Sequence, residues 1–484
     1  MPRTIFETSG QGKRGVRLPA PDVPAPGPAE LLASSLLRTD PPGLPEVSEP
    51  ELARHYADLA GKSFGVDTGF YPLGSCTMKH NPKVLERVAA LPGFADLHPC
   101  QPPETVQGAL RLMHELERML CAIGGMDAAC LQPPAGASGE FTCMRMIRAY
   151  HDSRGDRKRT RVLVPDTAHG TNPASVVRCG YTPTEVRSNE RGRVSVRAIR
   201  EALGDDVAGI MLTNPNTLGL FEDHILEVAE AVHAAGGLLY CDGANMNAIL
   251  GRARPGDMGF DAMHYNLHKT FATPHGGGGP GAGPIAVKAH LAPFLPTPRM
   301  VERDGELRFE DVGPLSIGKV QAFWGNFLVA VRAYAYIRLQ GAEGLEAISG
   351  AAVLNANYLM AALEAFFEVP YEGPCMHEFV ASAQNVLDQY GIRAADIAKR
   401  LIDFRMHPPT MYFPLIVKEA LMVEPTETES KRTLDEFIAA IMVVVEEAQQ
   451  QPDVLRTAPH TTPVGRLDEV RAARQLELRW RAEP

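Results

Sequence analysis

A lysine at the end of a predicted strand is the first residue in this sequence that could do covalent chemistry. The run Asn266-Leu267-His268-Lys269-Thr270 closes an apolar stretch that begins at Ala262, and a glycine tract follows at 276–279. A lysine can act as a nucleophile when partial desolvation keeps its amine neutral near pH 7. A lysine in this position is also a common surface residue, so the role of Lys269 depends on the residues that accompany it.

An aspartate closes a second apolar stretch. Asp242 follows the run Leu238–Cys241. A carboxylate in this position could keep the ring nitrogen of pyridoxal 5'-phosphate (PLP) protonated, which makes the ring an electron sink for a carbanion. An ordinary helix N-cap is the alternative role for such an aspartate. The spacing to Lys269 leaves room for a loop and one more strand, which would place both residues at the same sheet edge.

A loop of small residues could bind the phosphate of such a cofactor. The run Ala135-Gly136-Ala137-Ser138-Gly139 lies immediately before a helix predicted to begin at Glu140. Small residues let the backbone approach an anion, and the free N–H groups at a helix start bind phosphate. A plain serine N-cap is the alternative. Phosphate binding by Gly136, Ala137 and Ser138 therefore requires the other segments to lie nearby.

Two more polar segments follow predicted strands. His169 lies in the run Asp166–Pro173, and its imidazole could stack on the cofactor ring, although a lone histidine is more often a structural hydrogen-bonding residue. Thr213 opens the run Thr213–Thr217, which could add polar contacts to the ring substituents. The four segments fit one cofactor, so the sequence predicts a PLP enzyme with its Schiff base on Lys269.

Two other cofactor types fit the sequence poorly. Gly276, Gly278 and Gly281 match the dinucleotide pattern G-x-G-x-x-G, but three prolines within 274–284 prevent a helix from starting there to receive a pyrophosphate. The fifteen histidines are scattered, and no H-E-x-x-H or Cys/His pairing occurs. We therefore predict neither a nicotinamide site nor a metal site.

The segments that carry this chemistry lie in a stretch of alternating strands and helices from about 105 to 290. This alternation predicts an α/β fold with a mostly parallel sheet of the seven-stranded type, covered by helices on both faces. In such sheets ligands bind at the carboxyl ends of the strands, where the polar segments begin. The predicted helices are 107–123, 139–150 and 222–235, and the predicted strands are 161–164, 209–212, 238–241 and 262–267.

The remainder of the chain predicts a second, smaller α/β region and a proline-rich arm. Residues 18–50 contain nine prolines, which favour an extended arm with a short helix near 30–37. The arm either extends into solvent or lies across a partner subunit, and four leucines in it favour the second. Helices are predicted at 320–340 and 344–367, with strands at 378–381 and 411–413 and a short polar helix after Leu467. The predicted division is an N-terminal arm and helix (1–70), a large cofactor-binding domain (71–345), a small C-terminal domain (346–450) and a C-terminal tail (451–484).

Composition narrows the possible partners. The chain has 484 residues with a formal net charge of -10, which disfavours binding to nucleic acid or to an anionic membrane. The eight cysteines form no C-x-x-C pair, and the first residues contain no apolar signal segment. No apolar stretch is long enough to cross a bilayer. We therefore expect a cytoplasmic protein with reduced thiols.

Three runs closely resemble the P-proteins of the glycine cleavage system. They are Tyr71–Lys79 (Y-P-L-G-S-C-T-M-K), His169–Ser175 (H-G-T-N-P-A-S) and Asn266–Phe271 (N-L-H-K-T-F) with the glycine tract after it. The resemblance covers essentially the whole chain. Full-length P-proteins are much longer, and this chain resembles their C-terminal half, which prokaryotes with a split enzyme make as a separate second subunit.

The resemblance implies a PLP-dependent transferase fold of type I and the decarboxylation of glycine. Glycine would lose its carboxylate as CO2, and the aminomethyl group would pass to the lipoyl group of the H-protein. The implied assembly contains two copies of this chain and two of subunit 1. The implied site residues are Lys269 for the Schiff base, Asp242 and His169 for ring pairing and stacking, and Gly136, Ala137, Ser138 and Thr270 for the phosphate.

The residues themselves support PLP but do not specify glycine. A pocket for glycine has no room for a side chain, and Ser75-Cys76-Thr77 and Gly276–Gly279 are the runs we expect to shape it. Cys76 could be a redox-sensitive thiol or a small packing residue. An aminotransferase or desulfurase of the same fold, and a cofactor-free scaffold, remain the alternative functions.

Overall fold

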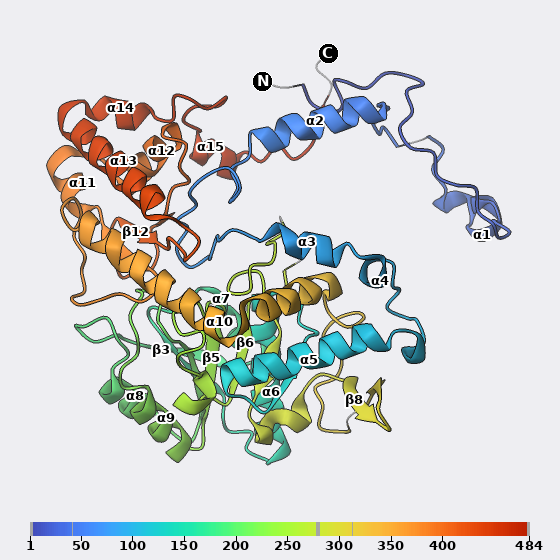
Figure 1. Ribbon diagram of the computed structural model, residues 1–484, viewed down its shortest axis with the longest axis horizontal. Coiled ribbons are helices and arrows are strands. Elements are labelled where there is room, and N and C mark those ends of the chain that lie inside the picture. The colour runs from blue at the N-terminus through green and yellow to red at the C-terminus, as the bar shows by residue number, and fades with distance from the viewer. Residues whose placement is uncertain (1–2, 41, 277–280, 312, 482–484) are drawn as a thin grey trace. The chain divides into compact units, whose positions relative to one another are not determined.

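The chain forms two compact units in a computed structural model that describes residues 3–40, 42–276, 281–311 and 313–481 (Figure 1). The larger unit spans Val66–Thr461, and the smaller one combines Met1–Gly65 with Thr462–Pro484. Every residue to which the sequence assigns chemistry lies in the larger unit. The larger unit is therefore the part of the chain that positions the site.

A seven-stranded sheet forms the centre of the larger unit, with the strand order β1-β7-β6-β5-β4-β2-β3. The five strands from β6 to β3 pair in parallel, whereas β7 runs antiparallel to both β1 and β6. The predicted α/β fold with a mostly parallel seven-stranded sheet is confirmed. The strands are β1 (Ala128–Cys130), β2 (Arg161–Pro165), β3 (Thr182–Val186), β4 (Val207–Thr213), β5 (Leu238–Gly243), β6 (Ala262–Tyr265) and β7 (Ile285–Val287).

Helices cover both faces of this sheet, because successive residues of a strand point to opposite sides. On β2, Leu163 packs into one core cluster while Val162 and Val164 pack into another. The first cluster includes residues of α5 and α10, and the second includes residues of α6. The helices of this part of the chain are α5 (Gln107–Gly124), α6 (Gly136–Ser153), α7 (Thr171–Arg178), α8 (Val196–Ala202), α9 (Ile225–Ala234) and α10 (Phe327–Leu363).

Three helix starts differ from the predicted ones. Helix α6 begins at Gly136, before the predicted start, because Ala135 takes the extended N-cap conformation and its carbonyl accepts from Gly139 N. Helix α9 begins at Ile225 instead of Glu222, whose carboxylate is held in a loop by Val194 N and the Asn216 amide. Helix α10 begins at Phe327 instead of Val320, and it is interrupted at Gly341, where φ is 64°.

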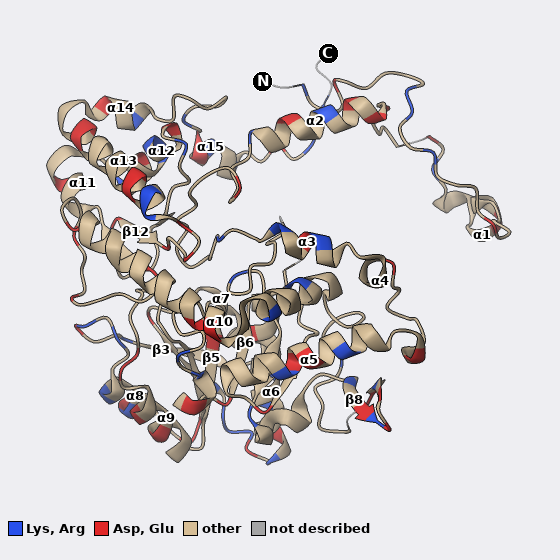
Figure 2. Cartoon of the chain, viewed as in Figure 1, with Lys and Arg blue, Asp and Glu red and all other residues tan. Residues whose placement is uncertain are grey.

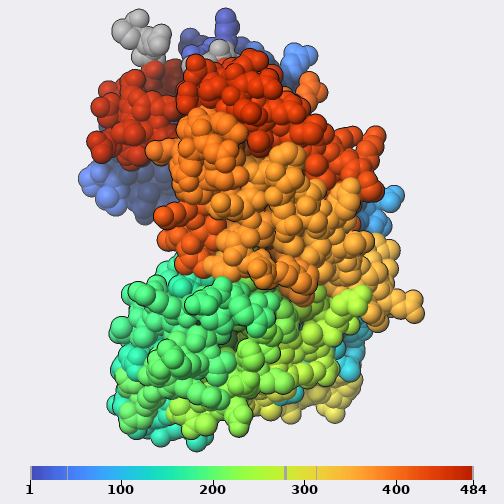
Figure 3. All heavy atoms as spheres, turned by 90° about the vertical axis from the view of Figure 1, so that its left-hand side faces the viewer, coloured from blue at the N-terminus to red at the C-terminus, as the bar shows by residue number. Residues whose placement is uncertain are grey.

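The C-terminal part of the larger unit adds a three-stranded antiparallel sheet in the order β10-β12-β11. The central strand β12 was not predicted, since its four apolar residues are too short to show a period. In Figure 3 the orange part of the chain lies directly against the green part. Met376 N, which follows α10, donates to Gly219 O, which follows β4, at 2.7 Å. The elements are β10 (Phe379–Ser382), β11 (Thr410–Met411), β12 (Ala420–Val423), α11 (Gln384–Tyr390), α12 (Ala394–Asp403), α13 (Lys431–Gln450) and α14 (Pro452–Thr457).

The other elements of the larger unit are short. Strands β8 (Arg299–Arg303) and β9 (Glu306–Glu310) form a hairpin, and α3 (Lys83–Ala89) and α4 (Pro92–Ala95) precede α5. Acidic and basic residues are interspersed along α5 and α13 in Figure 2. No helix in the described part of the chain is both long and apolar enough to span a bilayer.

The smaller unit contains α1 (Pro28–Leu31), α2 (Glu49–Gly61) and α15 (Glu469–Arg474). Its two chain segments meet where Phe6 stacks on Trp480, with ring centroids 4.8 Å apart. The predicted arm is extended, with only short helical turns near 28–36, and Leu31, Leu32 and Leu36 are exposed. Their burial against a partner subunit stays a prediction.

A buried ion pair holds the segment 71–79 onto the sheet. The Lys79 ammonium lies 2.8 Å from a Glu427 carboxylate oxygen and also donates to Thr270 O, in the residue that follows Lys269. Burial acts to lower the pKa of Lys79, but Glu427 and Tyr336 together hold that pKa above its usual range. Lys79 therefore carries its charge inside the protein and fixes the backbone beside Lys269.

Replacing Lys79 with methionine is expected to destabilise the chain strongly. The change leaves the buried Glu427 carboxylate without its cation, a loss that costs about 3–5 kcal/mol of unfolding free energy. Lys83→Met is the matched control, because Lys83 is exposed and pairs with an exposed carboxylate on Asp67, a type of pair worth about 0–1 kcal/mol. Urea unfolding followed by circular dichroism measures both. Equal losses for the two variants would contradict this account of Lys79.

Candidate active site

A cavity of about 170 Å³ opens at the carboxyl edge of the parallel strands. Strand ends, the start of α6 and the C-terminal part of the larger unit all contribute to it. The edge is the one at which ligands bind in sheets of this type. The lining residues are Ser75, Gly136, Ala137, Glu140, His169, Thr171, Thr213, Pro215, Thr217, Asp242, Ala244, Asn245, His264, Asn266, Lys269, His377 and Glu378.

Asp242 lies in a row of polar residues across three neighbouring strands. Thr213 of β4 is in register with Asp242 of β5, and Asp242 is in register with His264 of β6. The Asp242 carboxylate accepts from Asn172 Nδ2 at 2.9 Å and from Ala244 N at 3.1 Å. Burial acts to raise the pKa of Asp242, but His264, these two donors and Lys269 bring that pKa below its usual range. The structure thus supplies a buried carboxylate that stays ionised.

Lys269 lies at the same edge, in a turn after β6. Its Nζ atom donates to Ser75 O at 2.7 Å, and its side chain is partly exposed to the cavity. Lys269 is the only lysine among the described residues that line the cavity. A single amine beside a buried carboxylate is the arrangement that a covalently held PLP requires.

The start of α6 forms another side of the cavity. The N–H groups in the first turn of a helix have no intrahelical acceptor, so those of Gly136 and Ala137 are available to an anion. Two glycines allow the helix to approach β6 closely. A Cβ atom on Gly136 would lie 2.5 Å from Asn266 Oδ1, and one on Gly139 would lie 2.7 Å from His264 Cβ.

His169 and Glu140 face the cavity from the side of α6 and α7. Thr171 links them, because its hydroxyl donates to Glu140 Oε1 at 2.7 Å and lies 3.0 Å from His169 Nδ1. His169 is exposed at the cavity, yet desolvation by the surrounding protein lowers its pKa. The nearby Asp242 carboxylate acts to raise that pKa. Burial and the nearby Asp242 raise the pKa of Glu140 to about 7. His169 is therefore a neutral ring near pH 7, which suits stacking.

Two predicted phosphate ligands do not line the cavity. The Thr270 hydroxyl is buried and accepts from Met246 N at 2.9 Å. Ser138 lies in the first turn of α6, where its carbonyl accepts from Thr142 Oγ1. Both residues adjoin the site, since Thr270 follows Lys269 and Ser138 follows Ala137. Their contacts to a phosphate stay a prediction.

Of the two runs predicted to shape the pocket, Ser75–Thr77 is fully described and the glycine tract only at Gly276. Gly277, Gly278 and Gly279 lie outside the described residues. Ser75 lines the cavity, and the Cys76 thiol lies 3.6 Å from His275 Nε2. Burial raises the pKa of the Cys76 thiol, which keeps it protonated and favours the packing role over a reactive one.

Unsatisfied polar atoms show that the cavity fits a polar ligand. Thr213 Oγ1 and Asn266 Oδ1 are buried and have no hydrogen-bond partner, and both residues line the cavity. Buried polar atoms of this kind usually have a partner in the functional protein. Together with Asp242, Lys269 and the start of α6, they match the ring substituents, ring nitrogen, aldehyde and phosphate of PLP.

The sequence matches the family described as "Glycine cleavage system P-protein" over residues 27–304, and "Glycine dehydrogenase, C-terminal domain" over residues 348–460. The chain belongs to the P-protein family of the glycine cleavage system. A relative from Desulforamulus reducens is 58% identical over 99% of this chain and 99% of its own length. One from Thermotoga petrophila is 58% identical over 99% of this chain and 100% of its own. Both are named "Probable glycine dehydrogenase (decarboxylating) subunit 2".

Solved structures share the fold of this P-protein family member. A glycine decarboxylase (P-protein) in an inhibitor-bound form aligns with a TM-score of 0.69 at 22% identity, over 86% of this chain and 93% of that one. Lactobacillus brevis glutamate decarboxylase aligns with a TM-score of 0.65 at 11% identity, over 88% and 97%. These likenesses support the predicted type I fold and, at such identities, the fold alone.

Sequence reasoning missed one group of residues in this site. His377 and Glu378 line the cavity, and the buried Glu424 lies beside them. They come from the C-terminal part of the larger unit, more than a hundred residues after Lys269, so no local spacing connects them to the lysine. His264 was also missed, although its alternation with Tyr265 on β6 places it on the face of Asp242.

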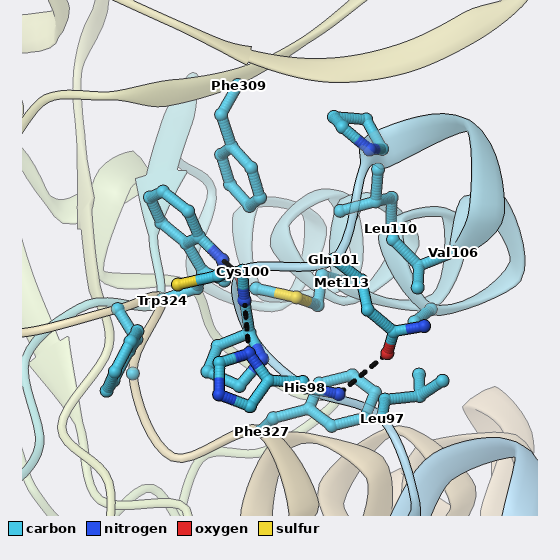
Figure 4. Close-up of a pocket in the computed structure, with 15 residues that line it drawn as sticks. Leu97, His98, Cys100, Gln101, Val106, Leu110, Met113, Phe309, Trp324 and Phe327 are labelled. Carbon is cyan, nitrogen blue, oxygen red and sulfur yellow. Dashed lines mark hydrogen bonds between the residues drawn. The ribbon is translucent and has the colours of Figure 1, made fainter. Parts of the chain in front are cut away.

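A second cavity, of about 370 Å³, lies elsewhere in the larger unit and is apolar (Figure 4). Phe309, Trp324, Phe327 and Met113 surround it, and Phe309 stacks on Trp324 at a centroid distance of 3.9 Å. The described residues that line it include no lysine, arginine or carboxylate. It therefore lacks the groups that amino-acid chemistry needs, although it is the larger cavity.

Proposed function

We propose that this chain is the PLP-bearing subunit of a two-subunit glycine dehydrogenase (decarboxylating). Membership of the P-protein family supports glycine as the substrate. The observation that carries the cofactor assignment is the meeting of Lys269, Asp242 and the start of α6 at one cavity. In this proposal glycine loses CO2, and the aminomethyl group passes to the lipoyl disulfide of an H-protein.

Five residues of the cavity have a definite task in this proposal. Lys269 would hold the cofactor through its side-chain amine. PLP, when bound, supplies an electron sink for the pair of electrons left by CO2. The Asp242 carboxylate would pair with the ring nitrogen and keep it protonated, and His169 would stack on the ring. The N–H groups of Gly136 and Ala137 bind the phosphate.

The partners of this chain are also part of the proposal. Relatives covered over their whole length carry the name "subunit 2", which implies a subunit 1. We expect two copies of each subunit in the assembly and a cytoplasmic location, consistent with eight free cysteines. Because the residues proposed to hold the cofactor all lie in this chain, subunit 1 would act by completing or stabilising the site.

Exchange of labelled bicarbonate into the carboxyl group of glycine tests the function. We expect exchange to require this chain, subunit 1 and lipoylated H-protein together. Exchange at the full rate without subunit 1 would contradict the two-subunit assembly. Formation of pyridoxamine phosphate from an amino acid, or release of sulfide from cysteine, would instead identify an aminotransferase or a desulfurase. Purified protein without visible cofactor absorption would favour a scaffold.

A further inference from the structure

A buried cluster of two carboxyl groups and an imidazole lies beside Lys269. His377, Glu378 and Glu424 each offer a side-chain nitrogen or oxygen, and these atoms lie within 4.8 Å of one another. These residues are almost completely buried, with exposed fractions of 3%, 4% and 1%. His377 and Glu378 line the cavity. The proposed binding of the cofactor uses none of these three residues.

The backbone holds Glu378 in this position. Gly219, which follows β4, has φ +76°, and a Cβ atom there would lie 1.8 Å from Glu378 O. Only glycine lets the two chain segments approach so closely. Ser75 N donates to Glu378 Oε2 at 2.7 Å, and Ser75 O accepts from Lys269 Nζ at 2.7 Å. One residue therefore separates the Glu378 carboxyl group from the amine that glycine would displace.

The two carboxyl groups differ in how they are hydrogen-bonded. Glu424 Oε1 accepts from Thr77 Oγ1 at 2.6 Å and from Asn245 Nδ2 at 2.8 Å, which stabilises a charged Glu424. Burial and the nearby Glu424 raise the pKa of Glu378 to about 8, and burial also raises the pKa of Glu424. The Glu378 carboxyl group accepts one hydrogen bond, from Ser75 N, whereas Glu424 accepts two. A proton shared by this pair therefore lies mainly on Glu378.

The imidazole of the cluster is neutral as well. Burial and the nearby Lys269 lower the pKa of His377 to about 3. His377 Nδ1 and Glu424 Oε2 are buried and have no hydrogen-bond partner. Unpartnered atoms on such buried residues indicate that a polar group from a ligand completes the cluster.

An α-amino acid brings a carboxylate into this cavity, yet no arginine occurs among the described residues that line it. We propose that Glu378 and His377 bind the substrate carboxylate as neutral hydrogen-bond donors, and that Glu424 keeps the proton on Glu378. This inference rests on the proposed function, because it assigns the carboxylate subsite of the same cavity.

Neutral donors suit a substrate that must lose its carboxylate. An arginine would form an ion pair with the carboxylate before reaction, and this attraction would be lost as neutral CO2 departs. Interactions that are stronger in the ground state than in the transition state slow the chemical step. A neutral acid orients the carboxylate with less of this penalty. It also leaves the negative charge free to move toward the ring.

Binding of glycine to the PLP-loaded complex of this chain with subunit 1 tests the proposal. The visible absorption of the cofactor reports this binding. Glu378→Leu removes the donor and should weaken glycine binding about 10- to 150-fold, the range for hydrogen bonds to charged groups. Binding of methylamine, which has no carboxylate, should not change. Glu378→Gln keeps an N–H donor and should bind glycine like the wild type at pH 7.

The pH dependence of glycine binding separates this role from a structural one. Because the pKa of Glu378 is raised to about 8, Glu378 carries its proton below that pH and loses it above. The affinity of the wild type for glycine, relative to its affinity for methylamine, should therefore fall above about pH 8. Glu378→Gln should abolish this fall. Glu424→Gln removes the neighbouring negative charge, lowers the pKa of Glu378 and should move the fall to lower pH. The other titratable groups that interact with Glu378 are Cys76, Cys375, His377 and Lys269.

A matched control and three contradicting outcomes complete the test. Glu222 is another buried residue whose carboxyl pKa is raised to about 7, but it does not line the cavity. Glu222→Gln should therefore leave the affinity for glycine relative to methylamine unchanged. Equal losses of glycine and methylamine binding in Glu378→Leu would overturn the proposal, as would an unshifted alkaline fall in Glu378→Gln. Glycine binding that a metal chelator abolishes would assign the cluster to a cation instead. A wild type that does not respond to glycine would refute the proposed function itself.

Discussion

Lys269→Ala is expected to abolish the covalent attachment of PLP and with it nearly all bicarbonate exchange. The variant loses the amine proposed to hold the cofactor, which belongs to the only lysine among the described residues of the cavity lining. Removing a positioned group of this kind costs about 10²- to 10⁴-fold in rate from proton transfer alone. Visible absorption that survives dialysis in the wild type, but not in the variant, provides a measurement independent of activity.

Lys288→Ala is the matched control for this prediction. Lys288 also follows a strand of the sheet, but its backbone N–H donates to Asp261 O, in the residue before β6, so it lies at the opposite edge. Lys288→Ala should keep both the absorption and the exchange. A Lys269→Ala protein that is folded by circular dichroism and still retains the absorption after dialysis would remove Lys269 as the anchor. Partial recovery of exchange with added methylamine would support loss of the amine as the cause.

The sequence predicts the fold well where strands are long, apolar and regularly followed by helices. Four of the seven strands of the main sheet were predicted, because β2, β4, β5 and β6 are continuous apolar runs ended by polar residues. Strands β1 and β7 have only three residues each, and their antiparallel pairing arises from contacts between distant segments. Such pairing leaves no local pattern in the sequence.

The residues of the candidate site also divide into those that a local sequence pattern predicts and those that it does not. Thr213, Asp242 and Lys269 could be found because each stands at or just after the end of a predicted strand. Glu378 and Glu424 could not, because folding brings the C-terminal part of the larger unit onto the sheet edge. The position of Ser138 also depended on where α6 begins, and a helix start is less certain than the helix itself.

Asp242→Asn is expected to slow bicarbonate exchange by roughly 10²- to 10⁴-fold, the equivalent of about 3–5 kcal/mol for loss of one partner of a buried charge pair. An amide cannot hold the ring nitrogen of PLP protonated, so the ring becomes a weaker electron sink. The amide also has one acceptor oxygen for the two donors, Asn172 Nδ2 and Ala244 N, that Asp242 satisfies. We therefore expect a change in the absorption of the bound cofactor as well as slower exchange.

Asp261→Asn separates the loss of ring pairing from a general loss of buried charge. Asp261 is also a buried carboxylate, but it precedes β6 at the opposite edge of the sheet, where His233 Nε2 lies at 2.9 Å and Leu239 N at 2.7 Å. Removing its charge should lower the free energy of unfolding while the folded enzyme keeps the wild-type absorption and exchange rate. If Asp242→Asn lost only stability, as Asp261→Asn should, Asp242 would be a structural residue and the cofactor nitrogen would require another partner. A normal unfolding free energy with slow exchange would instead assign the effect of Asp242 to the reaction.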